Sequence, residues 1–415
     1  MRTLGLATVL FAALGAGAAS AQSANYSLRT LISIPPAAAN VQPGGAFTSF
    51  DIGFFDPVSR NYYIADRSNA SVDIISGNTL QVVGQATGFT GQQATTSTSG
   101  ADGVVAVTSG GFTTLYAGDG NSTLKVFNAT NPSAPTLLQS ISTGGSFRVD
   151  EMAYSPATHQ VLAANNADSP AYATLFNAPG GGASASISVT HITVPGAAAT
   201  DGMEQPVWNP NTGSFFVSVP SFAGDDAGGV VEINTNGAIG SIYRFGSMGI
   251  ASCGPAGIGL GGSGNLMVGC ANRGTQAVLL NPTANGHAGQ IVGTFAQISG
   301  TDELWYDPTS RDFFLTGANT AGHRVFSVIS DATDTFLGSV LLPVADASNP
   351  HSIAVDPLTD DVFVPLAGNT AAVGGNTACT AGCVAVFAPI PEPTTFALML
   401  AGLGLTVGWA KRRRA

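Results

Sequence analysis

Residues 350–364 read Pro-His-Ser-Ile-Ala-Val-Asp-Pro-Leu-Thr-Asp-Asp-Val-Phe-Val, and variants of this stretch recur along the chain. Each copy has an ionisable residue, a short apolar run, a turn that usually begins at Asp-Pro, Asn-Pro or Ser-Pro, and a second apolar run. Clear copies begin at Asp51, Glu204, Asp302 and His351. Including two copies without the proline, the pattern occurs seven times at a spacing of roughly fifty residues, which indicates a repeat architecture.

Each copy predicts β-strands rather than helices. The apolar runs are short, rich in Val, Ile, Phe, Tyr and Trp, and bounded by turn residues. Asp, Asn or Ser before Pro starts a tight turn because its side chain caps the backbone and Pro presets φ. The second copy replaces this turn with residues 108–112 and the fifth with residues 261–264.

A third apolar run follows a polar loop in each copy, and a weaker fourth precedes the next copy. Seven four-stranded units are what a β-propeller requires. We therefore predict an all-β fold, a seven-bladed β-propeller over residues 22–388. A pair of β-sandwiches or a β-helix is the alternative, although the period is too long for one rung of a β-helix.

The last copy ends at its third strand, Val384–Phe387, and lacks a fourth. The segment Tyr26–Ile34 near the other end has the composition of a strand. We expect it to pair with the last copy and close the ring, which would cover an exposed sheet edge.

The first residues have the pattern of a secretory signal peptide. Arg2 supplies the positive charge, residues 4–14 are mainly apolar, and Ala19-Ser20-Ala21 has the small residues of a cleavage site. Residues 1–21 are therefore expected to form a signal helix that is removed on export, with a core helix as the alternative.

Residues 389–415 have a different pattern. Pro391-Glu392-Pro393 is followed by an apolar run over residues 395–410 and by Lys411-Arg412-Arg413-Arg414. This order resembles the PEP-CTERM sorting signal, in which an exosortase recognises the three parts and cleaves near the Pro-Glu-Pro motif. The resemblance implies export through the inner membrane, a C-terminal transmembrane helix, and either anchoring or release to the cell surface or extracellular matrix. An anchor that is never processed is the alternative.

The net negative charge of the chain argues against nucleic acids as partners. Of its 415 residues, 14 are Lys or Arg and 25 are Asp or Glu, for a formal charge of −11. The two terminal segments hold five of the basic residues and only Glu392 of the acidic ones, which leaves 9 basic against 24 acidic groups in the body. An acidic body repels phosphate backbones and favours cations or neutral ligands, so we expect no nucleic-acid binding.

The four cysteines predict two disulfides, because an exported protein meets an oxidising compartment. Cys253 and Cys270 flank the turn at residues 261–264 and can face each other across a hairpin. Cys379 and Cys383 lie in one Gly- and Thr-rich loop. Zinc is the alternative, but these spacings differ from those of well-defined zinc sites.

The body resembles the YVTN/NHL/SMP-30 superfamily of propellers. Residues 350–364 resemble the YVTN repeat, and Glu204-Gln-Pro-Val-Trp-Asn-Pro-Asn-Thr-Gly213 is similar to a stretch of SMP-30/gluconolactonase proteins. The second likeness implies a divalent metal held at the channel mouth by one Glu and several Asn or Asp residues, with Glu204 in the place of that Glu. Gln205 departs from the family pattern, in which a Gly stands there.

When the copies are aligned, each of six blades has one ionisable residue near the same rim of the central channel. These rim residues are Asp51, Asp102, Asp150, Glu204, Asp302 and His351. Five carboxylates in a ring repel one another, so a cation or raised pKa values are expected. Oxygen ligands suit Ca²⁺ or Mg²⁺, with Glu204, Asp150 and Asp302 as candidate ligands. The alternative is that the carboxylates only cap backbone amides of neighbouring blades.

The sequence leaves two functions open. It has no Gly-x-Ser-x-Gly elbow and no His-Glu-x-x-His motif, and we assign no catalytic residue. The first function is an exported surface protein that binds an extracellular ligand or glycan and is linked to matrix or polysaccharide biology. The second is a cation-dependent lactonase-like hydrolase that uses the channel mouth.

Overall fold

The structure is a computed structural model that describes residues 24–178, 188–198, 202–271, 276–344, 350–368 and 378–390. The predicted signal peptide, the Pro391-Glu392-Pro393 motif and the predicted transmembrane run lie outside these residues. Within them, we find no helix whose length and apolar character would suit a membrane crossing.

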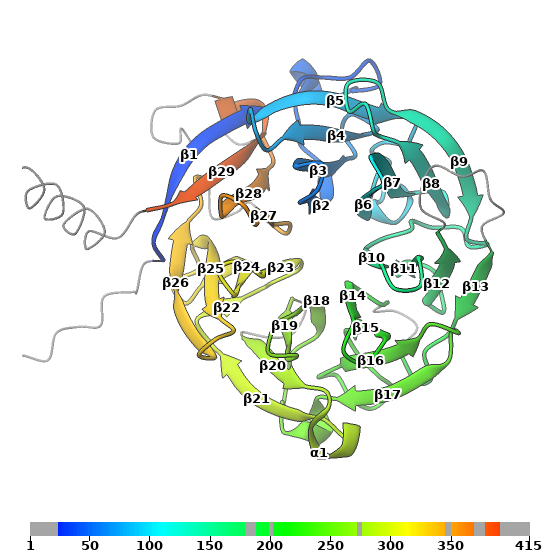
Figure 1. The fold of residues 1–415 in the computed structure, drawn as a ribbon, viewed down its shortest axis with the longest axis vertical. Helices are drawn as coiled ribbons and strands as arrows, with labels where there is room; N and C mark the ends of the chain where they lie inside the picture. The colour runs from blue at the N-terminus through cyan, green and yellow to red at the C-terminus, as the bar shows by residue number, and fades with distance from the viewer. Residues whose placement is uncertain are drawn as a thin grey trace, which may run out of the picture.

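The described residues form seven antiparallel sheets arranged as blades around a central axis (Figure 1). Six sheets have four strands, and the sixth blade has a short additional strand. The predicted all-β, seven-bladed propeller is therefore confirmed.

The innermost strand of each blade follows the central channel. These strands are β2 (Phe50–Asp56), β6 (Val104–Ser109), β10 (Met152–Ser155), β14 (Pro206–Asn209), β18 (Pro255–Leu260), β23 (Leu304–Asp307) and β27 (Ala354–Asp356). The second strands are β3 (Asn61–Asp66), β7 (Phe112–Asp119), β11 (Gln160–Asn165), β15 (Ser214–Val219), β19 (Leu266–Cys270), β24 (Asp312–Asn319) and β28 (Asp361–Leu366).

The two outer strands of each blade follow in order toward the perimeter. The third strands are β4 (Ser71–Ser76), β8 (Thr123–Asn128), β12 (Tyr172–Asn177), β16 (Gly229–Asn234), β20 (Ala277–Asn281), β25 (Arg324–Ser330) and β29 (Cys383–Pro389). The outermost strands are β5 (Gln81–Thr87), β9 (Thr136–Ser142), β13 (Val189–Ile192), β17 (Ile239–Arg244), β21 (Gln290–Phe295), β26 (Thr335–Leu341) and β1 (Tyr26–Ser33).

Few other elements occur in the described ranges. Strand β22 (Ile298–Ser299) pairs with β24, and α1 (Ala284–His287) is one short turn of helix. Short 3-10 segments span Pro43–Gly45, Thr96–Thr98, Gly246–Met248 and Ala378–Ala381.

The core lies between blades, because alternate side chains of a strand point to opposite faces of its sheet. Every residue of β3 is buried. Tyr63 belongs to the cluster shared with the second blade, where it packs with residues such as Leu115. Its neighbour Tyr62 belongs to the cluster shared with the seventh blade and stacks on Phe363, with ring centroids 5.0 Å apart. Strands buried on both faces explain the continuous apolar runs of the sequence.

The Asp-Pro turns form as predicted. Asp56 accepts hydrogen bonds from the backbone N–H groups of Val58 and Ser59, at 3.1 and 3.2 Å. The turn closes with a bond of 2.8 Å from Arg60 N to Asp56 O, and Arg60 has a left-handed φ of 56°. The side chain of Asp56 thus satisfies amides that a chain reversal leaves unpaired.

The N-terminal strand closes the ring as predicted. β1 pairs antiparallel with β29, in a register from Tyr26 opposite Pro389 to Ser33 opposite Cys383 (Figure 1). The Tyr26 ring makes edge contacts with Phe314 and Phe326 of the neighbouring blade, each at 5.7 Å. The last blade therefore contains both ends of the propeller, and the edge of β29 is covered.

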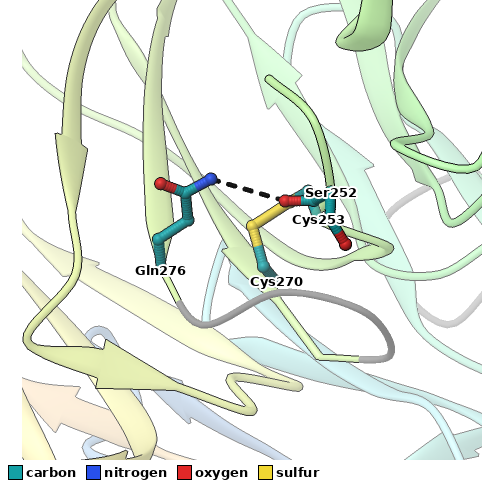
Figure 2. Close-up of a disulfide and its surroundings, with 4 residues drawn as sticks. All are labelled: Ser252, Cys253, Cys270 and Gln276. Carbon is teal, nitrogen blue, oxygen red and sulfur yellow. Dashed lines mark hydrogen bonds between the residues drawn. A yellow bond between two sulfur atoms is a disulfide. The ribbon is translucent and has the colours of Figure 1, made fainter. Parts of the chain in front are cut away.

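Both predicted disulfides are present. Cys253, just before β18, bonds to Cys270 at the end of β19, and Gln276 donates to the carbonyl oxygen of Ser252 beside it (Figure 2). Cys379 bonds to Cys383 at the start of β29. The described chain contains no free cysteine.

Candidate functional site

Two arginines that the sequence analysis did not single out join the predicted rim residues. Arg67, in the loop between β3 and β4, donates from Nη2 to Asp51 Oδ2 and to Asp102 Oδ1, each at 2.5 Å. Its Nε donates to the same Asp102 oxygen at 2.8 Å. Arg67 is only 4% exposed, so one buried cation joins a carboxylate of the first blade to one of the second.

The second arginine continues this network into the third and fourth blades. Arg148 lies between β9 and β10, with Nη2 at 2.7 Å from Asp150 Oδ2 and Nη1 at 4.0 Å from Asp51 Oδ2. Its Nε donates to Asn166 Oδ1 at 3.1 Å. Asn166 Nδ2 in turn donates to Asp150 and, at 3.3 Å, to Glu204 Oε2.

The seventh blade contributes His351. Its Nε2 is 3.5 Å from Asp51 Oδ1, and its ring stacks on Phe50 with centroids 4.7 Å apart. Burial raises the pKa of Asp302 in the sixth blade, and Asp302 also lies within electrostatic reach of His351, which lowers this pKa, and of Asp51, which raises it. The rim therefore brings the six predicted residues together: His351 contacts Asp51 directly, Arg67, Arg148 and Asn166 connect Asp51, Asp102, Asp150 and Glu204, and Asp302 is linked electrostatically.

These residues form two tiers that differ in exposure. The buried tier consists of Asp51, Asp102, Asp150 and Arg67. The accessible tier, made of residues that are only partly buried, consists of Arg148, Asn166, Glu204, Asp302 and His351. Because the buried tier is fixed by charge-assisted bonds, it holds parts of the accessible tier in place.

Burial controls the ionisation of the rim. It raises the pKa of Asp150 to about 7 and raises that of Glu204, where the negative charges of Asp302 and Asp150 add to the effect. Burial alone would also raise the pKa of Asp51, but Arg67, with His351 and Arg148, holds it below its usual range. The expected raised pKa values are therefore found at part of the rim, and Asp51 is the exception because it faces two guanidinium groups.

The close approach of the second and third blades at this rim requires Gly103. A Cβ atom at this position would lie 1.9 Å from the carbonyl oxygen of Asp150. Any side chain there would separate Asp102 from the rest of the buried tier.

The arrangement does not fit a divalent metal well. Within the described ranges, no three His, Cys, Asp or Glu residues are grouped so that they can hold a metal ion. The candidate ligand Asp150 instead contacts Arg148 and Asn166, and Asn166 also donates to Glu204. Guanidinium groups thus supply positive charge, and the Asn166 amide supplies N–H donors, to the carboxylates that were candidate ligands of Ca²⁺ or Mg²⁺.

Capping of backbone amides in neighbouring blades, the alternative role for the rim carboxylates, is found at a residue outside the predicted set. Glu303, next to Asp302, accepts at Oε2 from the backbone N–H groups of Gly53 and Ile353, at 3.5 and 3.3 Å, and from the Ser352 hydroxyl. Glu303 thereby links the sixth blade to the first and seventh. Asp51, Asp102 and Asp150 are instead held by Arg and Asn side chains.

Sequence reasoning missed four charged residues, and the sequence contained a signal for each. Arg67 and Arg148 are two of the few Lys and Arg residues between the terminal segments, and Arg148 stands two residues before Asp150. Glu151 and Glu303 directly follow Asp150 and Asp302 in aligned copies. Both are buried, and burial raises their pKa well above the usual range.

Residues 389–414 match the family model described as the PEP-CTERM protein-sorting motif. The chain carries a PEP-CTERM sorting motif. The motif indicates an exported protein directed to the cell surface and implies processing by an exosortase. It covers only the C-terminal end and assigns no activity to the propeller.

Comparisons of the whole chain show the fold alone. No curated protein matches the sequence. A chain in the "Crystal Structure of Mitotic Checkpoint Complex" is similar with a TM-score of 0.58 and 11% identity, covering 94% of this chain and 98% of that one. The β-propeller domain of Cps50 (Swd1) from Myceliophteria thermophila is similar with a TM-score of 0.56 and 12% identity, covering 80% and 95%. The resemblance to the YVTN/NHL/SMP-30 group stays a prediction.

Proposed function

We propose that this protein is an exported, surface-associated binding module that recognises a polar extracellular ligand, a glycan of the matrix, at the rim of its channel. The observation that carries the proposal is the accessible tier. Arg148 and Asn166 offer hydrogen-bond donors, Glu204 and Asp302 offer acceptors, and His351 can serve in either role.

A glycan fits this mixture because each sugar hydroxyl both donates and accepts hydrogen bonds. Arg148 has 18% of its side chain exposed and His351 17%, so each presents one edge while the rest is held by neighbours. Side chains that are already ordered lose little conformational entropy on binding, which favours affinity. The sorting motif supports the same proposal, because it directs the propeller to the surface, where such polymers occur.

The rim supports binding better than the alternative function, a cation-dependent lactonase. That chemistry needs a divalent ion that polarises a carbonyl or activates water. The predicted ligands Glu204, Asp150 and Asp302 are not grouped for such an ion within the described chain. We therefore derive no hydrolytic step.

The test is isothermal titration of the full chain with polysaccharide fractions from the envelope of the producing bacterium. We expect saturable binding that weakens about tenfold or more in Arg148→Gln, since a charge-assisted bond is lost. The matched control is Arg29→Gln on the outer strand β1, where 48% of the side chain is exposed. No saturable binding, or equal affinities of both variants, would count against the rim as the glycan site.

Surface display is tested separately. Replacing Pro391, Glu392 and Pro393 by alanine in the producing cell should leave a longer, membrane-retained form, because the processing enzyme recognises this motif. Immunoblots of membrane and surface fractions measure the outcome. Unchanged processing would contradict the role of the motif and leave the binding proposal standing.

A further inference from the structure

The opposite half of the central channel contains a cavity of about 620 Å³. The innermost strands of the first six blades line it, and it reaches the Asp-Pro and Ser-Pro turns, where Pro57, Pro156 and Pro308 are exposed. Its volume lies within the range typical of small-molecule sites. This cavity is separate from the rim, since β2 has Asp51 near its start at the rim and ends with Asp56 beside the cavity.

The walls of the cavity are mainly apolar and aromatic. Phe54, Tyr154, Trp208, Trp305 and Tyr306 come from four different blades. Phe54 and Trp305 touch edge to face, with centroids 5.3 Å apart, so part of the wall is a packed aromatic surface. Aromatic faces attract cations as well as apolar groups.

The inner end of the cavity has a buried acceptor without a donor. Glu151 is 2% exposed and lines the cavity, and its Oε2 has no hydrogen-bond partner. Leaving a buried polar atom unpaired is costly, and native proteins rarely do so. The neighbouring carboxylate, Glu303, is held by Ser352 and by backbone amides.

The one side-chain amide at this level is already engaged. Gln205 Oε1 accepts from the N–H groups of Ile258 and Leu304, at 2.7 and 3.4 Å, and its Nε2 donates to Leu304 O at 3.3 Å. Among the described residues that line the cavity, Asp56, Glu151 and Glu303 are acidic and none is Lys, Arg or His. The lining thus leaves one carboxyl oxygen without a donor and three acidic side chains without a cation, and a bound molecule that carries N–H groups and a positive charge would supply both.

We propose that this cavity binds a small apolar molecule with one primary amine, whose ammonium group donates to Glu151 and whose aromatic or alkyl body lies against the aromatic wall. The acidic side chains of the lining favour a positively charged ligand. The unpartnered oxygen of Glu151 favours a cation that has N–H groups, and the apolar walls favour a ligand whose remaining part is aromatic or alkyl. The proposal is independent of glycan binding at the rim.

Isothermal titration of the full chain with three matched probes tests the proposal: 4-phenylbutylamine, 4-phenylbutanol, and the trimethylammonium analogue of the amine. We expect the amine to bind at least about tenfold more tightly than the alcohol, because its hydrogen bond is charge-assisted. The trimethylammonium probe, which has the charge without N–H groups, should also be weaker than the amine. Equal affinities of amine and alcohol, or no saturable binding of the amine at millimolar concentration, would overturn the proposal.

Variants locate the site. Glu151→Gln should reduce amine affinity about tenfold or more and leave the alcohol unchanged, because it removes the carboxyl group that can ionise and pair with the ammonium but keeps the shape. Asp334→Asn, which removes the same charge at an exposed outer turn, is the matched control and should change neither. Val107→Trp on β6 should block both probes by filling the cavity. Unaltered amine binding in Glu151→Gln refutes the assignment, and if that variant does not fold, unaltered binding in Val107→Trp does so.

Discussion

Arg67 Nε and Nη2 both donate to Oδ1 of Asp102, at 2.8 and 2.5 Å, across the boundary between the first and second blades. Both residues are buried. Removing one member of such a pair strands the other charge in a poorly solvated position, which costs more than the pair itself contributes. The rim is thus a structural joint between blades as well as a candidate binding surface.

Arg67→Ala should lower the free energy of unfolding by about 3 to 5 kcal/mol, because Asp51 and Asp102 lose their shared cation. Urea denaturation followed by circular dichroism measures this loss. The control is Arg29→Ala, whose partly exposed pair with Asp361 should contribute under about 1 kcal/mol. Similar losses of unfolding free energy in the two variants would show that the buried Arg67 contacts stabilise the protein no more than an exposed ion pair does.

Ring closure depends on the buried face of β1. Ile32 is 6% exposed and packs in the cluster that contains Phe363 and Val384, whereas Leu28 on the same strand is 39% exposed. Ile32→Ala should therefore lower the free energy of unfolding by about 2 to 4 kcal/mol. Leu28→Ala should change it by less than about 0.5 kcal/mol. Denaturant titration compares the two, and a larger loss in Leu28→Ala would refute the closure geometry.

The two disulfides should stabilise the protein to different degrees, because they close loops of different length. Cys253 and Cys270 are separated by 17 residues, and Cys379 and Cys383 by 4. Chain-entropy reasoning gives about 3 kcal/mol for the longer loop and about 2 kcal/mol for the shorter. Melting of the two double Cys→Ala variants tests the order, and the reverse order would contradict the entropic account.

A buried carboxyl of the first blade should make stability fall as pH rises. Asp73 Oδ1 accepts from Ser71 Oγ and Gln85 Nε2, each at 2.9 Å, but burial still raises its pKa from 3.8 to about 6. Well below pH 3.8 both the folded and unfolded chains hold the proton, so Asp73 carries no penalty there. Between about pH 4 and 6 only the unfolded chain releases it, and stability drops by roughly 3 kcal/mol.

Asp73→Asn is the matched test of this pH dependence, because it keeps the shape and cannot ionise. The difference in unfolding free energy between wild type and variant should shift by roughly 3 kcal/mol in favour of the variant between pH 4 and pH 7. Urea titrations at intermediate pH values measure it. A constant difference would mean that Asp73 keeps its ordinary pKa in the folded protein.

The fold was largely predictable because a propeller repeats one local pattern. Asp56, Asp307 and Asp356 each mark a turn by capping amides within a few residues, so the signal lies within the sequence itself. Ring closure by Tyr26–Ser33 was predictable for a related reason, since a missing fourth strand at one end of the chain matched a spare strand at the other.

The candidate site was only half predictable, because its partners come from different positions in different blades. Alignment of the repeats identified Asp51, Asp102 and Asp150, which occupy equivalent places. Arg67 and Arg148 lie in two different kinds of loop, one between β3 and β4 and the other between β9 and β10. A repeat pattern carries no information about such unique insertions, so the sequence predicted a cation or raised pKa values at the rim but not the two guanidinium groups that lie there.

The sequence by itself determined the blade number, the strand order and the sorting motif at the C-terminus, because each follows from motifs that are close together or repeated along the chain. The structure settled which cysteines pair. Only the tertiary structure decided that Arg67 and Arg148 reach the acidic rim and that the buried Glu151, with one oxygen unpaired, lies at the wall of an apolar channel. The physical reason is that charge balance and cavity shape depend on side chains that blades far apart in sequence bring to a common axis.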